Sequence, residues 1–305
     1  MSKEEEEEFS DIPLADAIDI AILMHREVHF GGKFEFMQEY YAKEGVGVCE
    51  AFEKERIDAL AKLEQGLGQN LAPTLLSGAA AEQIARAKEA YKKLRDIYEL
   101  PETKNHYPRL IADLILAEEE FPQKEINAVV KEKGAIVPFL MDLLRAEDFH
   151  DPLFPGYGLA PMRAMRCLGL IGDKRAVVGL FEMIGEGDFF EENVALEALA
   201  VIGNQAKEFL LRVLRSHPIT YDNERAAVAL LQFKDDPEIA DIFFEILNKL
   251  DLKHNALLGT HLVLGCEQLI APEKRQAFTA LAHHPETPSS LKLDMEMVMK
   301  AWNMQ

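Results

Sequence analysis

The chain has 305 residues, of which 33 are Lys or Arg and 53 are Asp or Glu, so its formal net charge at pH 7 is −20. A hydrophobic fraction of 48% and a charged fraction of 28% are typical of a folded protein and exclude a wholly disordered chain. The negative charge also disfavours binding to nucleic acid or to anionic lipid, because both contacts need a cationic surface.

The sequence predicts a cytoplasmic protein that does not insert into membranes. Its N-terminus has glutamates at residues 4–8, where a secretory signal needs an apolar segment. The longest stretch without Asp, Glu, Lys or Arg, residues 65–81, contains a proline and three glycines, which excludes a spanning helix. Cys49, Cys167 and Cys266 are far apart and lack metal-binding spacing, so we expect reduced thiols.

The predicted elements in the first third of the chain are helices. We expect residues 1–10 to form an acidic disordered tail and residues 11–103 to form an irregular N-terminal helical region. The first helix is predicted to begin after Asp11. A short helix over residues 34–41 has aromatic residues at helical spacing, which indicates a place in the core. The alternative is that these rings line an apolar groove for a ligand.

Residues 104–305 are predicted to form helix pairs followed by a C-terminal capping helix. Four segments follow one another at a step of 31 residues, namely residues 164–172, 195–203, 226–234 and 257–265. Each has a small or apolar residue first and a large apolar residue eighth, and three of the four end in glycine. A second amphipathic helix follows each segment. Neither helix of a pair can bury its apolar stripe alone, so we expect the pairs to stack on one another.

The repeated segments resemble HEAT repeats of the short bacterial type called PBS-lyase HEAT-like. The resemblance covers residues 164–184 and 195–214 and, less closely, residues 134–144. The shared features are a first helix rich in small residues, a Leu-Gly-x-Ile-Gly-Asp turn at residues 168–173 and a Val-x-x-Leu second helix at residues 177–180. The resemblance implies an all-α fold with a right-handed α-α superhelix. It also implies a protein-binding scaffold, which is the usual role of such arrays.

Two enzyme classes that use similar folds are disfavoured. HEAT-type metal hydroxylases carry several His-Glu dipeptides as iron ligands, and this chain contains none. HEAT-like DNA glycosylases present a basic face, whereas residues 104–305 contain 21 Lys or Arg and 31 Asp or Glu, a net charge of −10. No nucleotide-binding or nucleophile motif is present, so we expect no cofactor and no catalytic activity.

An unusual loop is predicted at residues 147–158, where acids and aromatic residues are mixed with prolines and glycines. Aromatic side chains on a constrained loop can anchor a protein partner. The candidate contacts are Asp148, Phe149, Asp151, Phe154 and Tyr157. Two alternatives remain at this point. The aromatic residues could pack the loop onto the first regular repeat, or the acids could act with the neighbouring imidazole in metal binding or acid–base catalysis.

A second acidic and aromatic turn is predicted at residues 188–192, Asp-Phe-Phe-Glu-Glu, with Asp188, Phe189 and Glu191 as candidate partner contacts. Together with the loop at residues 147–158 it could line one edge of the repeat array and bind a basic or amphipathic peptide. The alternative is a solvated turn whose phenylalanines pack into the next helix pair.

His25 and His29 are four residues apart and could bind a metal ion from one helical face. The alternative is that both imidazoles continue the apolar face of their helix. The leading functional prediction is therefore a non-enzymatic scaffold or adaptor whose acidic surface binds a basic protein partner. A metal-dependent enzyme is the second hypothesis, and small-molecule binding between the two helical halves is the third.

Overall fold

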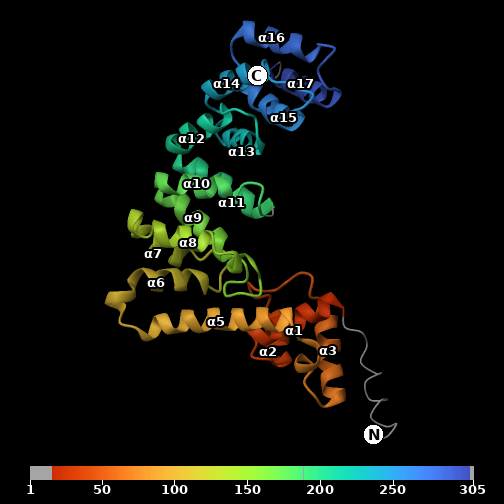
Figure 1. The fold of residues 1–305 in the computed structure, drawn as a ribbon, viewed down its shortest axis with the longest axis vertical. Helices are drawn as coiled ribbons and strands as arrows, with labels where there is room; N and C mark the ends of the chain where they lie inside the picture. The colour runs from red at the N-terminus through yellow and green to blue at the C-terminus, as the bar shows by residue number, and fades with distance from the viewer. Residues whose placement is uncertain (1–15, 188, 303–305) are drawn as a thin grey trace. The chain divides into compact units, whose positions relative to one another are not determined.

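The computed structural model describes residues 16–187 and 189–302, which form 17 α-helices and five short 3-10 helices and no β-strand (Figure 1). The predicted all-α fold is confirmed. None of the helices in these two ranges is long and apolar enough to cross a membrane. The predicted acidic tail at residues 1–10 lies outside the described residues.

The chain divides into two compact units. Unit 1 comprises residues 1–131 and 138–164, and unit 2 comprises residues 132–137 and 165–305. The predicted end of the N-terminal helical region falls inside helix α6 (Glu102–Ile115), which belongs to unit 1.

Unit 1 is built from short helices around one long helix, α5, which is drawn in orange in Figure 1. Besides α6 its helices are α1 (Ala17–His29), α2 (Phe34–Ala42), α3 (Lys54–Leu67), α4 (Ala72–Leu75), α5 (Ala79–Glu99), α7 (Gln123–Lys131) and most of α8 (Val137–Leu144). Helix α1 packs against α3, α4 and α5, while α6 packs against α5 and α7. The segment from residue 147 to 158 begins with a 3-10 helix, Glu147–His150, and continues as a loop.

Helix α1 begins at Ala17 because Asp16 caps it. The Asp16 carboxylate accepts hydrogen bonds from the backbone N–H groups of Ile18 (2.9 Å) and Asp19 (3.0 Å). The Asp19 carboxylate in turn accepts from the Asp16 N–H at 3.3 Å, which completes a capping box. The prediction that this helix begins after Asp11 is therefore wrong, and Asp11 itself lies outside the described residues.

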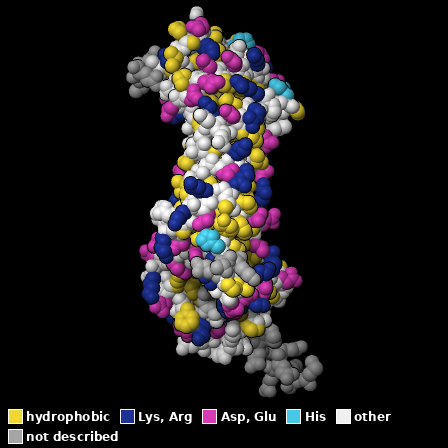
Figure 2. Space-filling view, turned by 90° about the vertical axis from the view of Figure 1, so that its left-hand side faces the viewer, with side chains coloured by type: hydrophobic (Ala, Val, Ile, Leu, Met, Phe, Trp, Pro, Cys, Tyr) yellow, Lys and Arg dark blue, Asp and Glu magenta, His cyan; other side chains and the backbone are white. Residues whose placement is uncertain are grey.

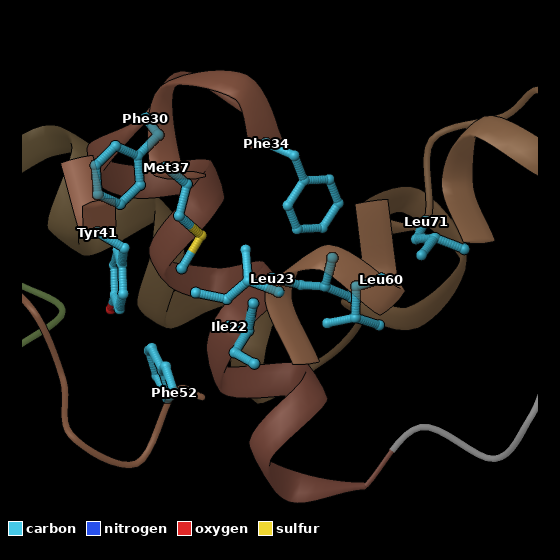
Figure 3. Packing of buried hydrophobic residues seen from close by; sticks show 10 residues of the cluster. Ile22, Leu23, Phe30, Phe34, Met37, Tyr41, Phe52, Leu60 and Leu71 are labelled. Carbon is cyan, nitrogen blue, oxygen red and sulfur yellow. The ribbon is translucent and has the colours of Figure 1, made fainter. Parts of the chain in front are cut away.

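The core between α1, α2 and α3 consists of aliphatic and aromatic side chains (Figure 3). Leu23 of α1 lies between Met37 of α2 and Leu60 of α3. Phe34 and Tyr41 of α2 are buried in the same cluster. The expectation that the aromatic residues of this helix contribute to the core is confirmed for these two.

A buried arginine closes the C-terminal end of α6. Arg163 is 1% exposed, and its guanidinium donates hydrogen bonds to four backbone carbonyls. The acceptors are Leu114 (3.0 Å), Ile115 (3.1 Å), Ala117 (3.1 Å) and Glu119 (2.5 Å). The last carbonyls of a helix have no hydrogen-bond partner within the helix, and they form the negative end of its dipole. A guanidinium at this position donates hydrogen bonds to these carbonyls and its positive charge is stabilised by the dipole.

Unit 2 is a succession of short helices. Its helices are α9 (Ala160–Ile171, of which the first five residues belong to unit 1), α10 (Val177–Glu182), α11 (Phe189–Ile202), α12 (Asn204–Leu214), α13 (Tyr221–Leu230), α14 (Pro237–Leu247), α15 (Ala256–Gly265), α16 (Pro272–Ala282) and α17 (Ser289–Trp302). Successive helices pack in order from α10 to α13, α14 packs against α15, and α17 packs against both α15 and α16.

The four segments that repeat every 31 residues lie on α9, α11, α13 and α15, and the second helix of each pair follows as α10, α12, α14 and α16. Small residues in the first helices allow these helices to approach closely. A Cβ atom on Gly169 of α9 would come within 2.7 Å of the Ala198 Cα of α11. A Cβ atom on Gly265 of α15 would overlap the ring of Phe243 on α14. The glycine and alanine pattern of the repeats therefore has a packing cause.

Replacing Arg163 by Met is expected to destabilise the protein by at least about 3 kcal/mol, because four carbonyls at a buried helix end lose a charged donor. Urea unfolding followed by circular dichroism measures the loss. Arg215→Met, at an exposed position of unit 2, is the control and is expected to unfold near the wild-type midpoint. Equal midpoints for the two variants would show that the carbonyl contacts of Arg163 contribute nothing to stability.

Candidate functional site

The acids of the predicted loop at residues 147–158 face helix α5 of the same unit. The Asp148 carboxylate lies 3.2 Å from the Arg86 guanidinium, and both groups are partly exposed. The Asp151 carboxylate accepts a hydrogen bond of 2.6 Å from the Gln83 amide and another of 2.8 Å from the loop's own backbone at residue 153. Two of the predicted partner contacts are therefore already occupied by contacts within unit 1.

The aromatic residues of this loop also pack inward. Phe154 is 1% exposed and contacts Ala87 of α5, while the Arg86 guanidinium lies 5.6 Å from the Phe154 ring centre. The expectation that Phe154 contacts a partner is therefore corrected, because its side chain has no surface to offer. Phe149 is half-buried. The loop thus follows the packing alternative, and its aromatic residue Phe154 packs against α5.

His25 and His29 lie side by side at the end of α1, with ring centres 5.2 Å apart. Both ring nitrogens of His29 have partners, because Nε2 lies 3.1 Å from the Pro152 carbonyl and Nδ1 lies 2.9 Å from the Tyr91 hydroxyl. A carbonyl oxygen can only accept, so the neutral ring carries its proton on Nε2, and the Tyr91 hydroxyl donates to Nδ1. This geometry leaves no lone pair of His29 free for a metal ion.

Burial disfavours the charged form of both imidazoles. It lowers the pKa of His25 to about 4, and burial together with the neighbouring His25 lowers the pKa of His29 to about 4, against weaker opposing effects of the Pro152 carbonyl and Asp151. Both rings are neutral at pH 7. Within the part of the chain that the structure describes, no group of three or more His, Cys, Asp or Glu could hold a metal ion.

Tyr157 joins this cluster and is not a free anchor for a partner. Its ring centre lies 4.8 Å from that of His29 and 6.2 Å from that of Tyr40, and the ring covers the backbone of Gly47 so closely that a Cβ atom there would overlap it. The Tyr40 hydroxyl accepts a hydrogen bond of 3.0 Å from the Gly47 N–H. Burial raises the pKa of Tyr157 most, and the hydrogen bond to Tyr40 raises this pKa further. Burial also raises the pKa of Tyr91.

The second predicted turn is different, because its aromatic residues are exposed. Helix α11 of unit 2 begins at Phe189, and Asp188 lies outside the described residues. Phe189 is 78% exposed and Phe190 is 72% exposed, with ring centres 6.1 Å apart. The alternative in which both phenylalanines pack into the next helix pair is therefore wrong. Glu191 is half-buried, and its side chain lies against the backbone of Gly187.

Further aromatic and acidic groups surround the start of α11. Tyr221, the first residue of α13, is 53% exposed, and its hydroxyl lies over Gly185. Arg225 forms ion pairs with Glu186 and with Asp222 (3.6 Å), and its guanidinium lies 4.7 Å from the Tyr221 ring centre. We call this set of exposed and half-buried residues the aromatic–acidic surface, and define it by Phe189, Phe190, Tyr221, Glu186, Glu191, Glu192 and Asp222.

The sequence identified Phe189, Phe190, Glu191 and Glu192 of this surface as one turn but did not identify Tyr221, Glu186 and Asp222. The one feature of the sequence that could have indicated these three residues is their position near the ends of predicted helices. Elsewhere acidic and basic side chains are interspersed, as Figure 2 shows for one face of the molecule. The net charge of −20 is therefore not gathered into a single acidic patch on that face.

No model of a known protein family matches this chain, and no curated protein is similar to it.

The stability of unit 1 is expected to fall as the pH drops from about 6.5 to about 4. Both histidines bind protons more weakly in the folded state, so the unfolded state takes up more protons in this range and stability rises with pH. Below this range, the free energy of unfolding is expected to be lower by roughly 3 kcal/mol for each imidazole. Urea unfolding between pH 7 and pH 4 measures it.

The control for this pH dependence is His254→Gln, which changes an exposed imidazole of unit 2. His29→Gln is expected to flatten the dependence, whereas His254→Gln is expected to leave it unchanged. A wild-type profile without loss of stability between these pH values would contradict the assignment of two buried neutral imidazoles.

Proposed function

We propose that the protein is a non-enzymatic interaction scaffold or adaptor, and that its aromatic–acidic surface binds a basic, partly apolar segment of a protein partner. The exposure of Phe189 and Phe190 at the start of α11 is the observation that carries the proposal. Two adjacent phenylalanines that face solvent on an ordered helix are a common feature of protein interaction sites.

The apolar part of the surface gives a favourable free energy of binding. The two rings offer about 300 Å² of mostly apolar area, since a phenylalanine can bury 150–250 Å². At roughly 25 cal/mol per Å², full burial is worth several kcal/mol before the entropic cost of association is subtracted. Tyr221 extends this area toward α13 and adds a hydroxyl group.

The charged part of the surface selects the partner. Four carboxylates, those of Glu186, Glu191, Glu192 and Asp222, belong to this surface, and Arg225 pairs with Glu186 and Asp222. The local balance is negative, so lysine and arginine side chains of a partner are complementary to the rim, whereas phosphate groups are not.

The same proposal includes a HEAT-like arrangement in which the helix pairs of unit 2 stack in a right-handed superhelix. Support comes from the 31-residue step, which places equivalent segments on α9, α11, α13 and α15. Stacked pairs would place the start of α11 among equivalent turns along one edge. A cytoplasmic location is also part of the proposal and is supported by three cysteines that are all free thiols.

The test begins with capture of partners from a cell extract by the full-length protein, followed by mapping of the bound segment and its synthesis as a peptide. The peptide is expected to carry a net positive charge. Phe189→Ser/Phe190→Ser is expected to raise its dissociation constant in calorimetry at least about tenfold, because the exposed rings supply the apolar contact. Added salt is expected to weaken binding.

The matched control is Leu293→Ser/Met297→Ser, which removes two exposed apolar side chains of α17. This control is expected to bind the peptide as the wild type does. Equal affinity of the peptide for the wild type and for Phe189→Ser/Phe190→Ser would contradict the proposal, and so would a bound segment with a net negative charge.

A further inference from the structure

A cavity of about 550 Å³ lies within unit 1, on the side of helix α5 that faces the end of α6. Its walls are α5, the last turn of α1, the segment 115–118 that ends α6, and the loop residues Gly156 and Tyr157. Cavities of roughly 300–1,000 Å³ are typical of small-molecule sites. The cavity belongs to unit 1 alone and is independent of the function proposed for unit 2.

The wall formed by α5 is cationic. Lys88, Lys92 and Arg95 line the cavity and stand at steps of four and three residues, so they share one face of the helix and extend over about 10 Å. Lys88 lies 3.4 Å from Glu27, and Lys92 lies 3.8 Å from Glu89. Both pairs are long and partly exposed, so they neutralise the two lysines only weakly.

Arg95 forms no ion pair with any carboxylate among the described residues, and its side chain is exposed. Glu118 is the acidic residue of the lining. The lining residues therefore include three cations and one anion, while Glu27 and Glu89, outside the lining, pair weakly with two of the cations. The cationic side chains along α5 make this wall locally positive in a chain whose net charge is −20, and a locally positive wall attracts a small anion.

The backbone carbonyls of the wall opposite α5 repel an anion only weakly, because Arg163 donates hydrogen bonds to them, and the Glu118 carboxylate is the negative group of this wall. The end of a helix exposes carbonyl oxygens and is its negative end. Here the carbonyls of Leu114, Ile115 and Ala117 all accept hydrogen bonds from the buried Arg163 guanidinium, which adds a positive charge behind this wall. The segment 115–118 can thus lie beside an anionic ligand.

The floor of the cavity offers hydrogen-bond acceptors. Tyr91 donates its proton to His29 Nδ1, so the lone pairs of the Tyr91 oxygen remain as acceptors for a ligand. The Glu118 carboxylate is a second acceptor. A ligand that is complementary to the cavity in charge and in hydrogen bonding has a negative group near α5 and hydroxyl groups near Tyr91 and Glu118.

We propose that this cavity binds a small hydroxylated phosphate ester, with its phosphate held by Lys92 and Arg95 and its hydroxyl groups by Tyr91 and Glu118. A phosphate presents three acceptor oxygens and suits several cations spread along a helix better than a single carboxylate does. The class of molecule is that of sugar phosphates.

The test is calorimetric titration of the full-length protein at constant ionic strength with four probes: glucose 6-phosphate, inorganic phosphate, glucose and citrate. Glucose 6-phosphate is expected to bind with a dissociation constant on the order of 1 mM or tighter. Inorganic phosphate is expected to bind more weakly, and glucose is not expected to bind. Absence of binding by both phosphates would overturn the site, and tighter binding of citrate than of glucose 6-phosphate would overturn the assignment to phosphate esters.

Variants assign the binding to this cavity. Lys92→Gln/Arg95→Gln is expected to weaken glucose 6-phosphate binding at least about tenfold. The matched control, Lys93→Gln/Lys124→Gln, removes two exposed cations of unit 1 that do not line the cavity and is expected to bind as the wild type does. Glu118→Gln is expected to reduce the preference for glucose 6-phosphate over inorganic phosphate. Equal affinities in the cavity variant and the control would overturn the proposal.

A measurement on the wild type alone provides a second test that does not depend on folding of any variant. Addition of glucose 6-phosphate is expected to shift the NMR signals of the His29 ring, which lines the cavity, and to leave those of the exposed His254 ring in unit 2 unchanged. Equal shifts of both rings, or none, would overturn the proposal.

Discussion

Each helix of this chain has an apolar face that only a neighbouring helix can cover. Apart from α5, the described helices are too short to be stable alone in water, so packing of these faces supplies most of their stability. In unit 1, α1 contributes Ile22 and Leu23 to a core completed by α2 and α3 (Figure 3). In unit 2, Gly169 lets α9 approach α11 closely, and Gly265 lets α15 approach α14. Among the described residues, the two rings at the start of α11 are the most exposed large apolar side chains, and our proposal assigns them to a partner.

The two proposed sites differ in charge as well as in position along the chain. The aromatic–acidic surface of unit 2 presents rings surrounded by carboxylates, which suits a basic polypeptide. The cavity of unit 1 presents cations above neutral imidazole and tyrosine side chains, which suits a small anion. A net charge of −20 does not by itself predict either site. Local arrangement decides which ligands are attracted, because exposed charges more than about 10 Å apart are largely screened at physiological salt.

The all-α class, the positions of the repeated helical segments and the C-terminal helix at residues 289–302 could be predicted, because they depend on local periodicity and on a repeat of 31 residues. The cluster around His29 could not, because Tyr91 and Pro152 lie 62 and 123 residues away in sequence. The inward position of Phe154 was missed for the same reason, since α5 covers it from a distant part of the chain. Arg163 was missed because arginine is rarely buried, and only the end of α6 explains its place.

Site-specific photo-crosslinking tests the central claim, that the start of α11 is a binding surface for a basic polypeptide segment, most directly. A benzophenone amino acid replaces Phe189 in one sample and the equally apolar, exposed Leu293 of α17 in another. The account predicts that the label at position 189 forms an adduct with a lysine- and arginine-rich segment of another protein, that high salt reduces the yield, and that the label at position 293 does not form it. Adducts of equal yield from both positions, or adducts at position 189 only with acidic segments, would contradict the account.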